Sequence, residues 1–277
     1  MMETIQNFAK KHTIIYCILA EIVVLGSMIL AGMLMGALIG DRGVDGYVLQ
    51  ALQELIGALF AFAAVKVSGC GDVLTRKGIG FGKGLLVGGY FLFMGIYSAV
   101  VYTAIYEGER TLRPWYLIAV FVICMILVGI TEELLCRGVL AELLFRHFGA
   151  TKQGIWKAVI VSGVLFGLAH LSNLISADPV GVLVQCVVAG MMGMAFAAIY
   201  FRTGCIWVTV FLHAFVDICA LITGGLYTGA LAETISGYQP MQLIGVVPYV
   251  ILLLVVLRKK KMNQILERLS DAQGEIE

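Results

Sequence analysis

Eight long apolar runs constrain this chain more than any other feature of its sequence. Each is close to the roughly 20 residues that an α-helix needs to cross the hydrocarbon core of a membrane. The runs are Ile14–Ile39, Tyr47–Val67, Leu85–Tyr106, Trp115 to about Glu133 with a continuation toward Arg146 left open, Ile155–Leu171, Val180–Phe201, Cys205–Thr223 and Met241–Leu257. They predict an all-α fold, a polytopic membrane helix bundle with about eight transmembrane helices.

Composition excludes the other broad classes. Of the 277 residues, 60% are hydrophobic and 13% are charged, whereas a soluble domain carries roughly 25% charge. The net charge of +1 gives no support to a nucleic-acid partner. We therefore expect one integral membrane domain over residues 1–277, with its polar motifs in about 115–223 and a short cytoplasmic polar tail at 258–277.

Lys and Arg in the short loops predict the orientation, because they concentrate on the cytoplasmic side of a membrane protein. With eight spans, three basic residues fall on one side: Arg42, Arg110 and Arg113. Fifteen fall on the other: Lys10, Lys11, Lys66, Arg76, Lys77, Lys83, Arg146, Lys152, Lys157, Arg202, Arg258, Lys259, Lys260, Lys261 and Arg268. Both termini are therefore predicted to be cytoplasmic.

Glycines recur at four-residue spacing in two of the predicted spans. Gly32, Gly36 and Gly40 lie in or just beyond the first, and Gly84 and Gly88 lie at the start of the third. Small residues at this spacing let membrane helices approach closely. We expect packing between helices of one chain, with an oligomer formed through these faces as the alternative.

The first polar cluster is Thr131–Arg137, with the sequence TEELLCR. Ionisable groups inside a membrane span are costly and are functional candidates by default. Glu133 and Arg137 are i,i+4 neighbours on a helix and can pair, whereas Glu132 lies about 100° around the helix. The carboxylate of Glu132 is then left without a partner in this cluster. The alternative interpretation is that the cluster simply marks the cytoplasmic end of the helix.

Two further clusters lie on the fifth and seventh spans. Phe166 and His170 are four residues apart and are followed by Asn173, and His213 and Asp217 are also four residues apart. By itself a histidine in a helix is more often a hydrogen-bonded structural residue than a catalyst. A functional interpretation of these clusters therefore requires that they lie close to one another and to the first cluster in the fold.

Helix geometry permits such a meeting. At 1.5 Å per residue, Glu132, His170, His213 and Asp217 lie about 21, 27, 16 and 22 Å from the predicted cytoplasmic boundary, and tilt shortens the larger distances. All four can then share one layer, provided that the fourth helix continues past Glu133 toward Arg146.

Such a layer has the groups that peptide hydrolysis needs. Glu132 beside His170 can activate water as a general base, and His213 with Asp217 can stabilise an oxyanion. Glu132, His170 and His213 also form a donor set that suits zinc or another divalent metal, although the chain lacks an HExxH motif. The prediction is that no cofactor is needed, with a metal as the open alternative.

The sequences EELLCR, FGLAH and HAFVD, in this order on separate spans, resemble the three motifs of the CPBP intramembrane proteases. These are the CAAX prenyl endopeptidases and their bacterial, Abi-type relatives associated with bacteriocin processing or immunity. The resemblance covers about residues 129–220. It implies an eight-helix fold and cleavage of a peptide bond near the membrane.

The resemblance also implies roles for the residues. Glu132 with His170 would activate water, Glu133 with Arg137 would support the site, and the third motif would stabilise the oxyanion or complete a metal site. Two positions, Cys136 and Asp217, depart from the family pattern. Cys136 stands where relatives often have an aromatic residue. Asp217 takes the acid option of the third motif, and an acid donates a hydrogen bond only when it is protonated.

We therefore expect an intramembrane endopeptidase that acts on a membrane-associated protein or peptide, embedded in a lipid bilayer. From the resemblance, this is expected to be a bacterial cytoplasmic membrane. Two alternatives remain: a proton-coupled transporter that uses the same acids and histidines, and a non-enzymatic immunity or scaffold protein that keeps the motifs for structure.

Overall fold

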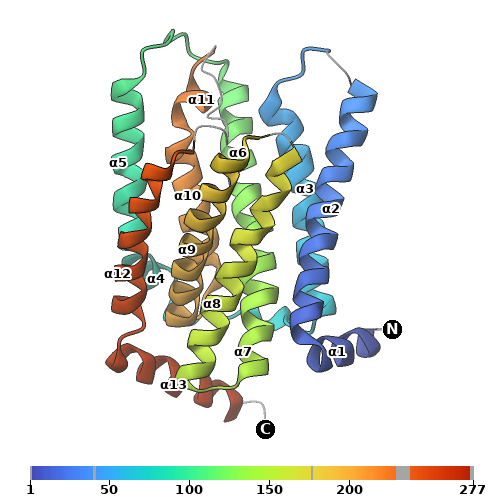
Figure 1. Ribbon diagram of the computed structural model, residues 1–277, viewed down its shortest axis with the longest axis vertical. Helices are drawn as coiled ribbons and strands as arrows, with labels where there is room; N and C mark the ends of the chain where they lie inside the picture. The colour runs from blue at the N-terminus through green and yellow to red at the C-terminus, as the bar shows by residue number, and fades with distance from the viewer. Residues whose placement is uncertain (1, 40–41, 176, 229–237, 275–277) are drawn as a thin grey trace.

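A computed structural model describes residues 2–39, 42–175, 177–228 and 238–274. This part of the chain folds into a bundle of long, roughly parallel and antiparallel helices (Figure 1). Its single β-type contact is an isolated bridge between Leu112 and Tyr227. The all-α prediction is confirmed.

Five stretches of helix are long and apolar enough to cross a membrane. Three of them are α2 (Thr13–Ile39), α3 (Gly46–Val67) and α9 (Pro179–Thr203). The fourth is α8 (Lys152–Ala169) together with the 3₁₀ turn His170–Ile175. The fifth is one continuous helix made of α6 (Trp115–Glu133), a π-helical segment (Leu134–Ala141) and α7 (Glu142–Phe148). The fourth predicted span does therefore continue past Glu133, for 34 residues in all.

The other three predicted spans are bent or short. Helices α4 (Phe81–Val87) and α5 (Gly89–Ile105) meet at 70°, and the segment Pro240–Val256, which contains α12 (Val246–Val256), meets α13 (Lys259–Gly274) at 61°. Helix α10 (Ile206–Ala220) is shorter than a usual span. Length and composition therefore support five to seven crossings in the described residues, and the count of eight stays a prediction.

Local sequence explains where several helices begin and end. Asp45, Thr151 and Asp178 each accept a backbone N–H at the start of α3, α8 and α9, respectively, which satisfies donors that have no partner within the helix. Pro179 occupies the first turn of α9, where its missing N–H costs nothing. Gly204, with φ of 67°, ends that helix in the left-handed conformation.

The helices nearest the two termini lie at the same end of the bundle (Figure 1). These are α1 (Met2–Lys11) and α13. The predicted polar tail is therefore largely helical in the described residues. Met262 and Ile265 of α13 are buried, and Nη1 of Arg268 donates to the carbonyl of Arg202 at 2.9 Å. Which side of the membrane this end faces stays a prediction.

A polar network ties the elements together at that end. Tyr200 of α9 donates to Glu142 of α7 at 2.7 Å, and Arg76, in the connection after α3, donates to the same carboxylate at 3.1 Å. Asp72 pairs with Arg76 and with Arg146. Burial raises the pKa of Asp72, but the hydrogen bond from Arg76 and the charges of both arginines outweigh it and hold that pKa below its ordinary value.

Gly84 and Gly88 allow α10 to approach closely. A Cβ at Gly84 would lie 2.4 Å from the side chain of Val208, and one at Gly88 would lie 2.1 Å from that of Leu212. Packing within the chain is therefore confirmed for this pair. It agrees with the role of small residues in membrane bundles.

The first-span glycines behave differently from one another. Gly32 faces the side chain of Gln53 on α3, whereas Gly36 has nothing within 4 Å, and Gly40 lies outside the described residues. Oligomer formation through this face stays a prediction.

Helices α8 and α9 pack closely at a pair of glycines. A Cβ at Gly167 would lie 2.5 Å from the carbonyl oxygen of Cys186 and 3.0 Å from the Cα atom of Gly190. Both neighbours are backbone atoms, which cannot move aside as a flexible side chain can. This contact fixes the helix that carries Phe166 and His170.

We predict that Gly167→Ala lowers the free energy of unfolding by about 1–3 kcal/mol, the usual cost of overpacking a close contact. Gly26→Ala is the matched control, because Gly26 is also helical but has nothing within 4 Å. Thermal unfolding in detergent measures both variants. Equal stability of Gly167→Ala and Gly26→Ala would contradict the assigned packing.

Candidate active site

The π-helical segment sets the register of the first motif. Glu132 and Glu133 end α6, and Leu134 begins eight π-helical residues, all of them buried. Short π-helical insertions often occur at functional sites. Gly138 lets α3 approach here, because a Cβ at Gly138 would lie 2.9 Å from the side chain of Val65.

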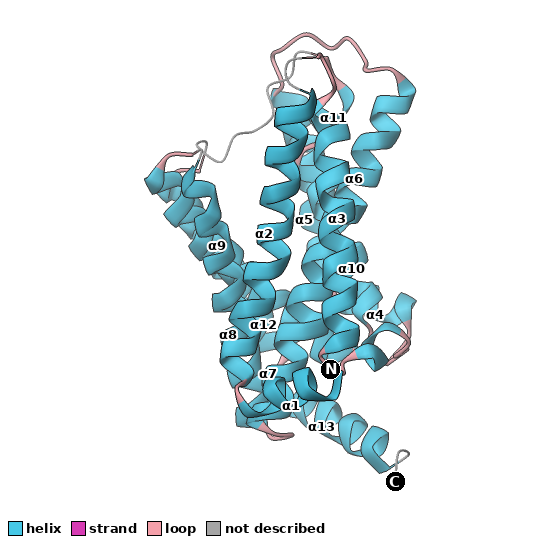
Figure 2. Cartoon of the chain, turned by 90° about the vertical axis from the view of Figure 1, so that its right-hand side faces the viewer, coloured by secondary structure: helices cyan, strands magenta, loops and turns pink. Residues whose placement is uncertain are grey.

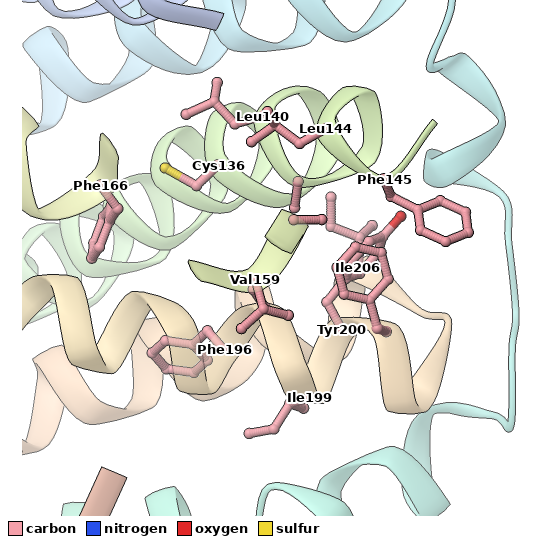
Figure 3. Packing of buried hydrophobic residues seen from close by; sticks show 14 of the residues in the cluster. Cys136, Leu140, Leu144, Phe145, Val159, Phe166, Phe196, Ile199, Tyr200 and Ile206 are labelled. Carbon is pink, nitrogen blue, oxygen red and sulfur yellow. The ribbon is translucent and has the colours of Figure 1, made fainter. Parts of the chain in front are cut away.

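Glu133 and Arg137 form the predicted ion pair, and it is fully buried. Nη1 of Arg137 lies 2.9 Å from Oε1 of Glu133, and their side chains are 1% and 0% exposed. Nη2 of Arg137 donates to the carbonyl of Gly193 on α9 at 3.0 Å. The guanidinium lies 5.2 Å from the ring centre of Phe166 and 5.3 Å from that of Phe196, two members of the buried cluster in Figure 3.

His213 lies between two adjacent carboxylates. Its Nδ1 donates to Oε1 of Glu133 at 2.7 Å, and its Nε2 lies 3.3 Å from Oε2 of Glu132. The ring of Phe196 stacks on the imidazole with a centroid distance of 5.2 Å. Oδ2 of Asp217 lies 3.7 Å from the same Nε2. Glu132 is therefore the carboxylate that the Arg137 pair leaves over, as expected, and it meets His213 of the same predicted layer.

These groups form a chain of alternating charge. In a neutral His213 that donates from Nδ1, Nε2 would turn a lone pair toward the Glu132 carboxylate, which is unfavourable. A proton shared between Nε2 and Oε2 of Glu132 removes this repulsion. The order Arg137, Glu133, His213, Glu132 then alternates positive and negative, which compensates charges that are costly to bury singly.

His170 is held in a different way. Its Nδ1 donates to the carbonyl of Phe166 at 2.9 Å, and its ring meets the Phe166 ring edge-on at 5.1 Å. Because a carbonyl oxygen only accepts, this bond places the proton of a neutral imidazole on Nδ1 and leaves Nε2 as an acceptor. Asn173, three residues on, donates to Oε1 of Gln185 on α9 at 2.9 Å.

Glu132 and His170 line one cavity of about 510 Å³. The cavity lies among α2, α3, α6, α8 and α9, on the side where α8 and α9 lean away from α2 (Figure 2). Among the described residues its lining includes Asn173 and Gln185 but neither His213 nor Asp217. Of the four residues of the predicted layer, Glu132 and His170 therefore line the cavity, whereas His213 and Asp217 lie outside its lining.

The predicted metal donors do not assemble into a metal site. Glu132 and His213 approach each other, but within the described parts of the chain no three His, Cys, Asp or Glu side chains are grouped so that they could hold an ion. His170 donates from Nδ1 to a carbonyl and stands apart from that pair. The arrangement present therefore does not fit the donor set Glu132, His170 and His213.

Comparison with known proteins identifies the segment that carries these residues. A family model described as type II CAAX prenyl endopeptidase Rce1-like matches residues 113–219. The match confirms the resemblance, and it places this segment in the Rce1-like CAAX prenyl endopeptidase family. No curated protein and no solved structure matches the chain. The family supports intramembrane endopeptidase activity in general for this multi-pass membrane protein.

Sequence reasoning missed four residues of this region. Phe196 and Gln185 carry no sequence signal, because an aromatic residue and a glutamine are unremarkable in an apolar helix. Glu21 and Glu54 do carry one, since both are acids inside predicted spans and both line the cavity. The criterion that selected Glu132 would have selected them too.

We predict that Arg137→Met lowers the free energy of unfolding by about 3–5 kcal/mol, because it leaves the Glu133 carboxylate buried without its cation. The double variant Arg137→Met with Glu133→Leu is expected to lose less than the sum of the two single variants. Denaturant titration in detergent measures all three. Additive losses would mean that the two side chains do not act as a pair.

Proposed function

We propose that this protein is an intramembrane endopeptidase in which Glu132 and His170 activate a water molecule for attack on a peptide bond. The observation that carries the proposal is that these two side chains line one cavity between long apolar helices. The Rce1-like match over the same helices supports the reaction class.

The chemistry follows from the two side chains. The Glu132 carboxylate takes a proton from the water, and Nε2 of His170 accepts the second hydrogen bond of that water. The oxygen then attacks the carbonyl carbon and forms a tetrahedral intermediate. Glu132 returns the proton to the leaving nitrogen as the carbon–nitrogen bond breaks, so that the carboxyl group is regenerated and no bond to the protein forms.

Glu133, Arg137 and His213 act as positioning residues in this proposal. The fixed ion pair holds His213, and His213 holds the carboxylate of Glu132 at 3.3 Å. Donors to the oxyanion have to face the substrate. Asn173 and Gln185 line the cavity, so we assign this role to their amide N–H groups in preference to His213 and Asp217.

The substrate we propose is a protein or peptide that is itself associated with the bilayer, since the cavity opens among membrane-spanning helices. We propose the bacterial cytoplasmic membrane as the location, with both termini in the cytoplasm. The support for the orientation is the bias of Lys and Arg, fifteen against three, in the loops of the predicted topology.

We predict that Glu132→Gln lowers the hydrolysis rate by about 10²- to 10⁴-fold, the usual contribution of a general base. Glutamine keeps the shape and an acceptor oxygen for His213, so the fold should persist. Glu107→Gln is the matched control, because Glu107 is exposed in the connection after α5. Mass spectrometry of a peptide library incubated with detergent-purified protein measures the rates.

Unfolding temperatures check that both variants are folded. A folded Glu132→Gln protein that cleaves as fast as the Glu107→Gln control would overturn the assignment of Glu132 as the base.

A further inference from the structure

The cavity holds two buried acids that the proposed reaction does not use. Glu21 of α2 and Glu54 of α3 both line it, and each is 7% exposed. Oε1 of Glu21 and Oε2 of Glu54 are buried without a hydrogen-bond partner among the described residues. Neither side chain belongs to any ion pair found in that part of the structure.

Glu54 lies at the level of Glu132. The hydroxyl of Thr131, the residue before Glu132, donates to the backbone carbonyl of Glu54 at 3.1 Å. The two acids therefore approach the cavity from neighbouring helices at one depth. A group bound at Glu54 would lie beside the scissile bond.

Glu21 lies farther along the cavity, toward the end of the bundle that carries the termini. Met28 of α2 and Thr131 of α6 lie at the same depth, because both are neighbours of Gly57 on α3. A Cβ at Gly57 would lie 2.7 Å from Sδ of Met28 and 2.9 Å from Cγ2 of Thr131. Seven residues separate Met28 from Glu21, which is about 10 Å along a helix. An extended peptide covers that distance in about three residues.

The charges of the lining point to a cation as the missing partner. The described residues of the lining include Glu21, Glu54 and Glu132 but no Lys or Arg. A buried carboxylate is costly unless it is paired and hydrogen-bonded. The cavity wall supplies no Lys or Arg for Glu21 or Glu54, so a cationic group of a ligand would give each of them the partner that the protein does not.

We infer that Glu21 and Glu54 form a specificity subsite for basic residues of the substrate peptide, in which each acid accepts its own Lys or Arg side chain, an inference that rests on the proposed endopeptidase function. The depths allow the cation within about three residues of the scissile bond. The apolar part of a long basic side chain suits Val24, Leu25 and Leu135, which line the same space.

The test uses fluorogenic peptides and the full-length protein in detergent. Each peptide has the same apolar host sequence, with Lys, Gln or Glu at one position that is moved through the three residues on either side of its centre. We expect wild-type kcat/KM to favour the best Lys peptide over its Gln counterpart by at least about tenfold, as a charge-assisted contact provides.

Glu21→Gln and Glu54→Gln are expected to reduce this preference while cleavage of the Gln peptide is retained. Glu107→Gln, which removes an exposed acid outside the cavity, is expected to retain the full preference. Equal cleavage of Lys, Gln and Glu peptides by the wild type would overturn the subsite, and this comparison needs no variant to fold.

Binding separates the subsite from the reaction. The same peptides are titrated into the Glu132→Gln protein by fluorescence anisotropy, with at least about tenfold tighter binding expected for Lys than for Gln. Selective Lys binding without any wild-type cleavage would refute the proposed function and support the subsite. Cleavage without charge preference would do the reverse, and a failure of both cleavage and selective binding would refute both.

Discussion

The buried pair of Glu133 and Arg137 is the interaction on which the rest of the site depends. Single charges inside a membrane bundle are costly, so both have to be satisfied by neighbouring elements. Arg137 reaches the carbonyl of Gly193, and its guanidinium lies near the rings of Phe166 and Phe196. The pair therefore requires α6, α8 and α9 to meet at one point.

This arrangement leaves the neighbouring acid facing the cavity. Glu133 uses its contacts on Arg137 and His213, whereas Glu132 keeps a side chain that is 32% exposed and lines the cavity. Two consecutive glutamates thus have different surroundings, because successive side chains on a helix point in different directions. His213 connects them, since it contacts both carboxylates.

Much of the architecture could be predicted from the sequence. Hydropathy predicted the apolar helices, and four-residue spacing predicted both the Glu133–Arg137 pair and the shared face of Phe166 and His170. The sequence left open whether the fourth helix continues past Glu133, and the shared layer of polar motifs was conditional on that continuation, which the structure shows. These inferences use only helix geometry, which depends little on the neighbouring elements.

What the sequence did not predict depends on tertiary contacts. The π-helical segment after Glu133 and the bend at Gly88 arise where other helices pack. The spacing of residues along the sequence therefore does not predict them. Helix spacing alone could not show that His213 contacts both carboxylates, because His213 lies on another helix, 80 residues after Glu133. The role of His170 also required structure, since the bond to the Phe166 carbonyl determines which nitrogen can accept.

We propose that side chains of this protein activate water without a bound metal. The most direct test measures metal content and peptide hydrolysis on the same purified, active preparation, before and after dialysis against a chelator. We expect well below one equivalent of any transition metal and unchanged hydrolysis after dialysis. One equivalent of zinc or another divalent metal, whose removal abolishes hydrolysis and whose return restores it, would contradict a metal-free mechanism.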